Sequence, residues 1–158
     1  MSSCLHRIKK GGRGISTPFC YVGCWPSWFG WHREDLDLFS LNYCHAGAAK
    51  IWWAVPQEQN EAFEKVVRDN ESSDVVICPE HMRHKTTIIS PEELAKKGIR
   101  LNTAIQTEGE WIVTYPTRYH AGYNTGGNVN EAVNYAPDYW VEYGKKAKQC
   151  KCFGKTNF

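Results

Sequence analysis

Two histidines and a glutamate are the residues whose types and spacing best suit redox chemistry. His32 and Glu34 stand two positions apart, and His120 lies far along the chain. On a strand, side chains at positions i and i+2 point to the same face, so the first two can reach one metal ion together. Two imidazoles and one carboxylate suit iron(II) and leave positions open for a bidentate ligand and dioxygen. The alternative is a pair of polar residues on an exposed strand, because His-x-Glu pairs are common.

The segment that follows the His-x-Glu pair weighs against that alternative. A single strand over residues 32–44 would place one row of side chains on the face of the candidate ligands: Leu36, Leu38, Ser40 and Asn42. This face becomes increasingly apolar. Charged groups at the start of a buried face require a partner, and a metal ion supplies one.

A second group of potential ligands combines thiols with an imidazole. Cys78 and His84 are separated by five residues, and a Cys-x-Cys pair, Cys150 and Cys152, stands near the C-terminus. Three thiolates and one imidazole form a closed tetrahedral zinc site of the structural type. The spacing is not that of a generic zinc finger, so unpaired buried thiols are the alternative. His81 is a rival ligand, because Cys-x2-His is also sterically possible.

The other cysteines argue against a disulfide framework. The chain has seven cysteines, and an odd number without a secretory signal favours metal binding and burial over cross-linking. We therefore expect reduced, mostly buried thiols at four positions: Cys4, Cys20, Cys24 and Cys44.

Composition indicates one folded, β-rich domain. A length of 158 residues suits a single hydrophobic core, and seven Trp and eight Tyr favour strands over disorder. The chain has no apolar run long enough to cross a bilayer and no apolar stretch of a signal peptide, so we expect an intracellular protein without a membrane partner. The net charge of +2 does not by itself indicate nucleic-acid binding. A run of lysines near the C-terminus forms either a solvated tail or a contact with nucleic acid: Lys145, Lys146, Lys148, Lys151 and Lys155.

Periodicity predicts strands with a few inserted helices. Helical spacing covers residues 57–70, Ser90 caps a second helix, and Asp138 can cap a third that runs to residue 148. The Gly- and Asn-rich stretch 120–130 indicates a loop or a short irregular strand. Seven segments have strand character: residues 18–23, 32–44, 50–55, 87–89, 104–107, 111–115 and 132–135. A small domain of this kind is expected to be a sandwich or a jelly roll.

Three stretches, in order along the chain, resemble a JmjC (Jumonji C) domain. They are GCWPSWFGWHREDLDLFSLNYCHAGAAKIWWAVP, RHKTTIISPEELAKKGI and YPTRYHAGYNTGGNVNEAVNYAPDYWVEYGKKAKQCKC. They are most similar to the Jumonji-type histone lysine demethylases with a structural zinc site. The resemblance implies a mainly β fold, a double-stranded β-helix (a jelly-roll, cupin-like barrel) with a few peripheral helices. It covers nearly all of residues 14–152, between a basic leading segment, 1–13, and a tail, 153–158.

The resemblance assigns both metal sites. The implied iron(II) ligands are His32, Glu34 and His120. The Arg-His-Lys context of the second site favours His84 over its rival, so the implied structural zinc ligands are Cys78, His84, Cys150 and Cys152.

The resemblance also implies 2-oxoglutarate and dioxygen as cosubstrates. The far carboxylate of such a keto acid needs a cation or a hydroxyl group, and Lys50, just past the turn after the ligand strand, is its natural partner. Asn42 can donate a hydrogen bond to the keto acid end, and the positions that match Phe29 and Trp52 line the pocket in the family. Taken alone, Lys50 would be a surface lysine. Related demethylases add a Tyr from a segment upstream of this chain's first residue, so we expect a fragment, a truncated product or a reduced form.

The implied activity is oxidative demethylation of N-methyl-lysine in histone tails. The implied partner is a methylated histone tail peptide or a nucleosome, and the implied location is the nucleus. Phe19 stands where a Tyr is typical and Ala132 where Ser is often found, and both changes remove a hydroxyl group. A protein hydroxylase and a catalytically weak chromatin-binding module stay open as alternatives. The positions that match the methyl-lysine cage are Gly14, Tyr21, Glu34, Lys85, Ala132 and Asn134.

Overall fold

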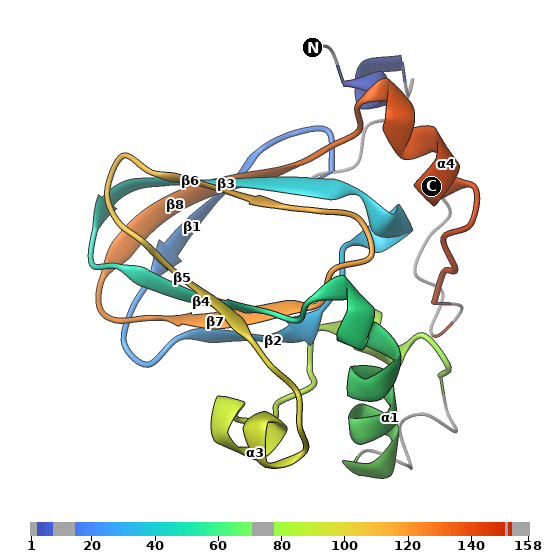
Figure 1. Cartoon of the computed structure of the whole chain (residues 1–158). Coiled ribbons are helices and arrows are strands. Elements are labelled where there is room, and N and C mark those ends of the chain that lie inside the picture. The colour runs from blue at the N-terminus through green and yellow to red at the C-terminus, as the bar shows by residue number, and fades with distance from the viewer. Residues whose placement is uncertain (1–2, 8–14, 71–77, 151, 153–158) are drawn as a thin grey trace.

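Two four-stranded sheets face each other and form the body of the molecule (Figure 1). The computed structural model describes residues 3–7, 15–70, 78–150 and 152. One sheet has the strand order β1-β8-β3-β6 and the other β2-β7-β4-β5, and all neighbouring strands are antiparallel. The strands are β1 Phe19–Gly23, β2 Trp28–His32, β3 Phe39–Gly47, β4 Lys50–Ala54, β5 Asn102–Gln106, β6 Trp111–Thr114, β7 His120–Asn124 and β8 Asn128–Tyr135. The predicted mainly β, jelly-roll architecture is confirmed.

The chain passes from one sheet to the other through tight connections, and one of them requires glycine. Gly47 ends β3 with a φ of +101°, a conformation that favours glycine, and a side chain there would overlap the backbone of Gly127. The chain then enters β4 at Lys50. This turn therefore sets where the candidate cosubstrate lysine points.

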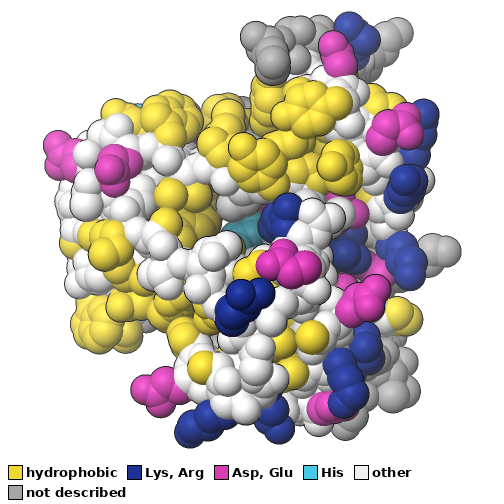
Figure 2. Space-filling view, in the orientation of Figure 1, with side chains coloured by type: hydrophobic (Ala, Val, Ile, Leu, Met, Phe, Trp, Pro, Cys, Tyr) yellow, Lys and Arg dark blue, Asp and Glu magenta, His cyan; other side chains and the backbone are white. Residues whose placement is uncertain are grey.

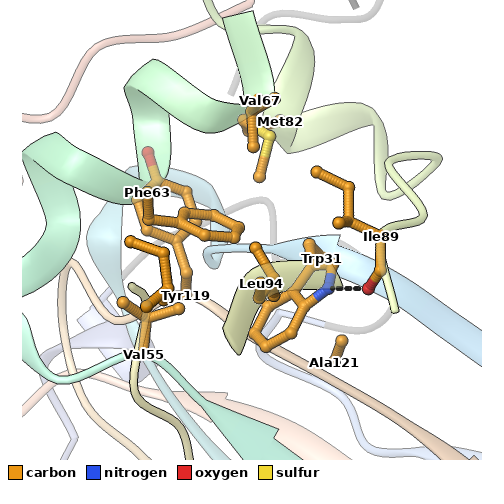
Figure 3. Packing of buried hydrophobic residues seen from close by; sticks show 10 residues of the cluster. Trp31, Val55, Phe63, Val67, Met82, Ile89, Leu94, Tyr119 and Ala121 are labelled. Carbon is orange, nitrogen blue, oxygen red and sulfur yellow. Dashed lines mark hydrogen bonds between the residues drawn. The ribbon is translucent and has the colours of Figure 1, made fainter. Parts of the chain in front are cut away.

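The largest apolar core lies outside the barrel, between the β2-β7-β4-β5 sheet and two helices (Figures 1 and 3). Helix α1 spans Asn60–Asn70 and α3 spans Pro91–Lys96. Trp31 is almost fully buried in this core, and its indole nitrogen donates to the Ile89 carbonyl over 2.9 Å. Because side chains alternate along β2, Trp31 anchors the strand to the helices while the next residue, His32, faces the barrel interior.

The predicted helix starts are partly confirmed. Residues 57–70 form a short 3-10 turn, Gln57–Gln59, followed by α1, and the Ser90 hydroxyl caps α3 by accepting from the Glu93 amide over 3.1 Å. The predicted C-terminal helix is much shorter, because a 3-10 turn at Asp138–Trp140 precedes α4, Val141–Gly144. Asp138 caps nothing, since its carboxylate accepts instead from the Cys4 thiol over 3.1 Å.

The single strand expected over residues 32–44 is wrong. β2 ends at His32, a 3-10 turn occupies Asp35–Asp37, and β3 begins at Phe39. Leu36 has a φ of 53°, so it leaves the interior row in which the pattern placed it. The Asp37 amide donates to the Glu34 carbonyl and the Leu38 amide to the Asp35 carbonyl, and these two hydrogen bonds close the turn. The apolar residues on either side of so short a turn still alternate in the sequence as they would in one strand, so the pattern did not reveal the break.

Of the two alternatives predicted for the Gly- and Asn-rich stretch 120–130, a loop or a short irregular strand, the structure favours strand, although it contains parts of two strands. β7 and β8 take up most of it, joined across residues 125–127. Gly122 is a site of close approach, because a side chain there would overlap the Ile51 carbonyl and the Phe29 ring. The expected strand at 87–89 is reduced to one bridge between Thr87 and Trp31.

All seven cysteines are free thiols, as the sequence indicated. Cys44 is buried and Cys4 half-buried, but the expected burial is wrong for Cys20 and Cys24, which are exposed on β1 and just after it. Among the described residues, no helix is long and apolar enough to span a membrane.

Candidate functional site

The barrel interior brings together His32, Glu34 and His120, the three predicted iron ligands. His32 ends β2 and pairs with His120, the first residue of β7, while Glu34 follows in extended backbone conformation. The Glu34 Oε1 atom lies 3.6 Å from His32 Nε2 and 3.5 Å from His120 Nε2. One ligand atom from each residue lies within 4.8 Å of the other two. The long strand was wrong, but the two-residue spacing still places both side chains at one point.

Neighbouring groups orient each of the three side chains. The Nδ1 atom of His32 lies 2.8 Å from the Gly30 carbonyl, and that of His120 lies 3.2 Å from the Arg118 carbonyl. Each Nδ1–H can therefore donate to a carbonyl, which leaves both Nε2 lone pairs facing inward. On Glu34, the Oε2 atom accepts from the Asn134 amide over 3.2 Å, so Oε1 is left for the centre.

Burial sets the protonation states that a metal ion requires. Burial lowers the pKa of His32 to about 4, with a further contribution from His120, so the imidazole is neutral at pH 7. For Glu34, burial alone would raise the pKa, but hydrogen bonds from His120 and His32 and the nearby Lys85 ammonium hold it well below its usual range. Lys85 Nζ lies 3.6 Å from Glu34 Oε2. Two imidazoles and one ionised carboxylate form a donor set that fits iron(II).

A cavity of about 390 Å³ adjoins the three residues and collects almost every predicted pocket residue. Gly14 lies outside the described residues. The predicted site residues that line the cavity are Tyr21, Phe29, His32, Glu34, Asn42, Lys50, Trp52, Lys85, His120, Ala132 and Asn134.

Lys50 is a buried cation at one end of this cavity, not a surface lysine. It is only 7% exposed, and burial lowers the pKa of its ammonium group. Its Nζ donates to the Asn124 side-chain oxygen and lies 5.7 Å from the centre of the Phe29 ring. Within the described part of the chain, no carboxylate forms an ion pair with it. A buried cation among neutral groups is suited to an anionic ligand.

Two further features complete the pocket wall. The Asn42 side-chain oxygen is buried without a hydrogen-bond partner among the described residues. An amide oxygen only accepts, so a hydrogen bond to a keto acid would have to come from the Asn42 amide nitrogen. The Trp52 indole donates to Gln106 over 2.9 Å, and Gln106 in turn donates to the Asn42 carbonyl over 3.1 Å. Sequence reasoning missed both Gln106 and Asn124. Asn124 lies in the stretch that was predicted as a loop or a short irregular strand, so no inward face was assigned to it. Strand alternation from His120 would have placed Asn124 on the inner face.

A second cavity, of about 850 Å³, opens between the edge strands β5 and β6. Figure 2 shows a hollow on this face of the molecule, with histidine atoms visible inside it. His120 and Trp52 line both cavities. The second cavity therefore borders the candidate centre at His120.

The four predicted zinc ligands also come together. The ligand atoms of Cys78, His84, Cys150 and Cys152 lie within 4.8 Å of one another, and His81 lies outside this group. Cys150 Sγ lies 3.0 Å from His84 Nε2 and 3.5 Å from Cys78 Sγ.

The pKa values of two thiols in this group shift in opposite directions, because the thiols hydrogen-bond to one another and one of them ionises more easily than the other. Burial raises the pKa of Cys78 to about 12, with help from hydrogen bonds to Cys152 and Cys150. For Cys150, burial also opposes ionisation, but the hydrogen bond from His84 and the Cys152 backbone lower its pKa to about 7. Three sulfurs and one imidazole at this spacing fit a tetrahedral zinc ion.

The predicted lysine patch has little structural support. Lys145 pairs with Glu142 over 2.9 Å at the exposed surface. Lys151 and Lys155 lie outside the described residues.

The fold and the site together define a class: a jelly-roll barrel with two histidines and one carboxylate converging on its interior. The chain belongs to the JmjC family, since the family described as "JmjC domain, hydroxylase" matches residues 19–135. It is 45% identical over 139 residues to "Probable lysine-specific demethylase 4F" of Homo sapiens. It is 43% identical to "Lysine-specific demethylase 4D" of Rattus norvegicus and 42% identical to "Lysine-specific demethylase 4B" of Mus musculus, again over 139 residues.

The similarity covers most of this chain but a small part of each relative. Each match includes 88% of this chain, and 22%, 27% and 13% of the three relatives in the order given.

Proposed function

We propose that this domain is an iron(II)- and 2-oxoglutarate-dependent dioxygenase that oxidatively demethylates N-methyl-lysine in histone tails. The observation that carries the proposal is one cavity that joins the cluster of His32, Glu34 and His120 to the buried cation Lys50. A metal site next to an anion site is the arrangement that a chelating keto acid with a distant carboxylate requires. Membership in the JmjC family and the demethylase names of the relatives support the same chemistry.

The chain's own residues would bind, orient and exclude water. His32, Glu34 and His120 would hold the metal on one side and leave the cavity side open. Lys50 would pair with the far carboxylate of 2-oxoglutarate, and the Asn42 amide would donate to the keto acid end. The chemistry supplied by iron(II) when bound is activation of dioxygen, with 2-oxoglutarate converted to succinate and carbon dioxide and an N-methyl group released as formaldehyde.

Two apolar walls would keep the reacting groups dry. The rings of Phe29 and Trp52 pack edge-to-face with centroids 4.9 Å apart, between the Lys50 end of the cavity and the candidate metal ligands. Excluding water strengthens the electrostatic interactions inside such a site.

The substrate side of the cavity is more apolar than the demethylase pattern implies. Phe19 and Ala132, the two positions that lack the expected hydroxyl groups, are paired across β1 and β8. Tyr21 is 52% exposed at the cavity mouth, with the Phe19 and Tyr21 ring centroids 6.1 Å apart. We propose Tyr21, Glu34, Lys85, Ala132 and Asn134 as the methyl-lysine contacts, with Gly14 assigned by resemblance alone.

Other assignments rest on the resemblance. Residues 14–152 would form the oxygenase domain, with Cys78, His84, Cys150 and Cys152 holding a structural zinc ion. The partner would be a methylated histone tail or a nucleosome in the nucleus, and the C-terminal lysines would contact nucleic acid. The names of the relatives support a histone-type substrate.

The test is turnover with a methylated partner. The protein would be loaded with iron(II) and given 2-oxoglutarate and a histone tail peptide that carries trimethyl-lysine. The proposal expects succinate, formaldehyde and stepwise loss of methyl groups from the peptide, all abolished in His120→Ala. A hydroxylated peptide without formaldehyde would identify a protein hydroxylase. No succinate from iron-loaded protein would leave a binding module.

A further inference from the structure

We infer that a buried row of asparagine side chains, ending at Asn124, positions Lys50 and keeps its charge available for a dicarboxylate ligand. This inference rests on the proposed function, because it concerns how the cosubstrate's far carboxylate is held. Asn124 acts through Lys50, and is therefore a positioning residue.

The row consists of three asparagines from β7 and β8. The Asn130 amide nitrogen donates to the Asn128 side-chain oxygen over 2.7 Å, and the Asn128 nitrogen donates to the Asn124 side-chain oxygen over 3.0 Å. The Lys50 ammonium donates to that same Asn124 oxygen. All three asparagines are buried, with exposures of 1%, 4% and 7% for Asn130, Asn128 and Asn124.

The hydrogen bonds fix which end of each amide faces the lysine. An ammonium group has only donors, so it requires the oxygen end of Asn124. That leaves the Asn124 nitrogen to donate to the Ser27 hydroxyl over 2.7 Å, and Ser27 donates onward to the Cys24 carbonyl over 2.5 Å. Turning the Asn124 amide over would oppose two donors at Lys50, and Ser27 could then bond to Asn124 only by giving up its donation to the Cys24 carbonyl. The row therefore presents an acceptor to Lys50 in one orientation.

The backbone leaves room for this row at Gly23 and ties it to the turn before Lys50. A side chain at Gly23 would overlap Asn124 and Asn128. The Asn128 nitrogen also donates to the Ala48 carbonyl over 3.0 Å, in the turn two residues before Lys50. The same asparagines thus hold both the lysine ammonium and the start of its strand.

A neutral partner at this position has a specific consequence. An amide oxygen satisfies one of the three donors of the ammonium group and leaves its full charge unneutralised. A carboxylate at position 124 would form an ion pair with Lys50, and an incoming ligand carboxylate would have to compete with it. The isosteric change Asn124→Asp therefore tests the inference with almost no change of shape.

The experiment compares two ligands of the iron(II)-loaded protein without oxygen, followed by the metal-to-ligand absorption band. 2-Oxoglutarate spans from the metal to Lys50, whereas oxalate chelates the metal and is too short to reach the lysine. In Asn124→Asp we expect the dissociation constant for 2-oxoglutarate to rise roughly 10- to 100-fold, the range for one charge-assisted hydrogen bond. Oxalate binding should stay within about twofold of the wild type, well inside one decade.

Two further variants complete the design. Asn70→Asp adds the same charge at an exposed position at the end of α1, away from both cavities, and should bind both ligands like the wild type. Ser27→Ala removes the acceptor that orients the Asn124 amide, and should weaken 2-oxoglutarate severalfold while sparing oxalate.

The outcomes separate the inference from the proposed function. A wild-type protein that binds oxalate but not 2-oxoglutarate would overturn the proposed cosubstrate, and the inference with it. Equal 2-oxoglutarate affinity in wild type and Asn124→Asp would overturn the inference alone. If Asn124→Asp does not fold, Ser27→Ala decides, and unchanged 2-oxoglutarate affinity in that variant refutes the role of the row.

Discussion

Replacing Arg83 with Met should destabilise the protein and loosen the iron site at the same time. The Arg83 side chain is 2% exposed and donates to three acceptors at once. It reaches the Glu34 carbonyl over 2.6 Å, Asp37 Oδ1 over 3.1 Å and Glu80 Oε2 over 3.1 Å. It therefore holds the backbone of a candidate iron ligand and the turn that follows it.

The expected loss of stability follows from the buried carboxylates and the buried carbonyl that would lose their donor. Removing one partner of a buried ion pair costs about 3–5 kcal/mol, and an orphaned buried carbonyl costs about 1–3 kcal/mol. Arg33 offsets part of this, because it lies 3.1 Å from Glu80 and 3.6 Å from Asp37. A net loss of about 3–5 kcal/mol in the free energy of unfolding is expected, which lowers Tm by about 6–20 °C in a domain of this size. Metal affinity should fall as well, because the Asp35–Asp37 turn holds two residues at positive φ that need this anchor.

The assay is urea unfolding of Arg83→Met beside a matched control, Arg68→Met. Arg68 pairs with Glu64 over 3.7 Å at the surface, and its loss should cost less than about 1 kcal/mol. Iron(II) binding by both variants would be measured by titration. Unfolding free energies that agree within about 1 kcal/mol would refute the reasoning, since Arg83 would then contribute no more than an exposed ion pair.

Three substitutions and a change of pH probe the cosubstrate pocket, the zinc site and the outer core. Lys50→Ala should raise the apparent constant for 2-oxoglutarate about 10²- to 10³-fold, because a carboxylate is left buried without its partner, and equal titrations would show that the pocket is misplaced. Cys150→Ser should abolish zinc binding and lower Tm sharply, since structural zinc contributes on the order of 10 kcal/mol in small peptides, and an unchanged Tm with no zinc in either protein would contradict this. In the wild type, zinc retention measured by metal analysis should fall as pH falls, because the thiols must be deprotonated to bind zinc and protons compete for them. The pKa of about 12 for Cys78 without zinc illustrates this competition. Phe63→Ala should cost about 3–5 kcal/mol in urea unfolding but leave iron affinity unchanged, and a parallel loss of iron would mean that core and site are not independent.

One short segment serves both candidate metal sites. The 3-10 turn His81–His84 contains a candidate zinc ligand, His84, and the arginine that anchors Glu34. The next residue, Lys85, has a φ of 62° and directs its ammonium to the Glu34 carboxylate. Loss of zinc would remove the support of this turn from one side, and this provides a physical path from the zinc site to the iron site.

The local spacing of the chemical residues could be predicted from the sequence. His32 and Glu34 needed only a short extended stretch to share a direction, and this survives although the long strand does not exist. The cap at Ser90 is equally local, because it depends on a hydroxyl group and an amide three residues apart. Lys50 is buried, as the family resemblance together with the apolar residues that follow it, Ile51, Trp52 and Trp53, had indicated; taken alone it would have been a surface lysine.

Tertiary structure decided what depends on partners far along the chain. The turn at Leu36 is held in part by two distant side chains, because Arg83 donates to the Asp37 carboxylate and the Trp140 indole donates to the Asp37 carbonyl. Residues far along the chain therefore help to determine where the predicted strand breaks. Gly122 lies in a strand where the Ile51 backbone and the Phe29 ring pack so closely that a side chain would not fit. No local sequence signal encodes this close contact with residues far along the chain. The asparagine row exists only once β7 and β8 lie beside Lys50 and Ser27. The sequence alone determined which groups could do chemistry, and long-range pairing determined which neighbours orient them, because amide and carbonyl partners are set by register and not by spacing.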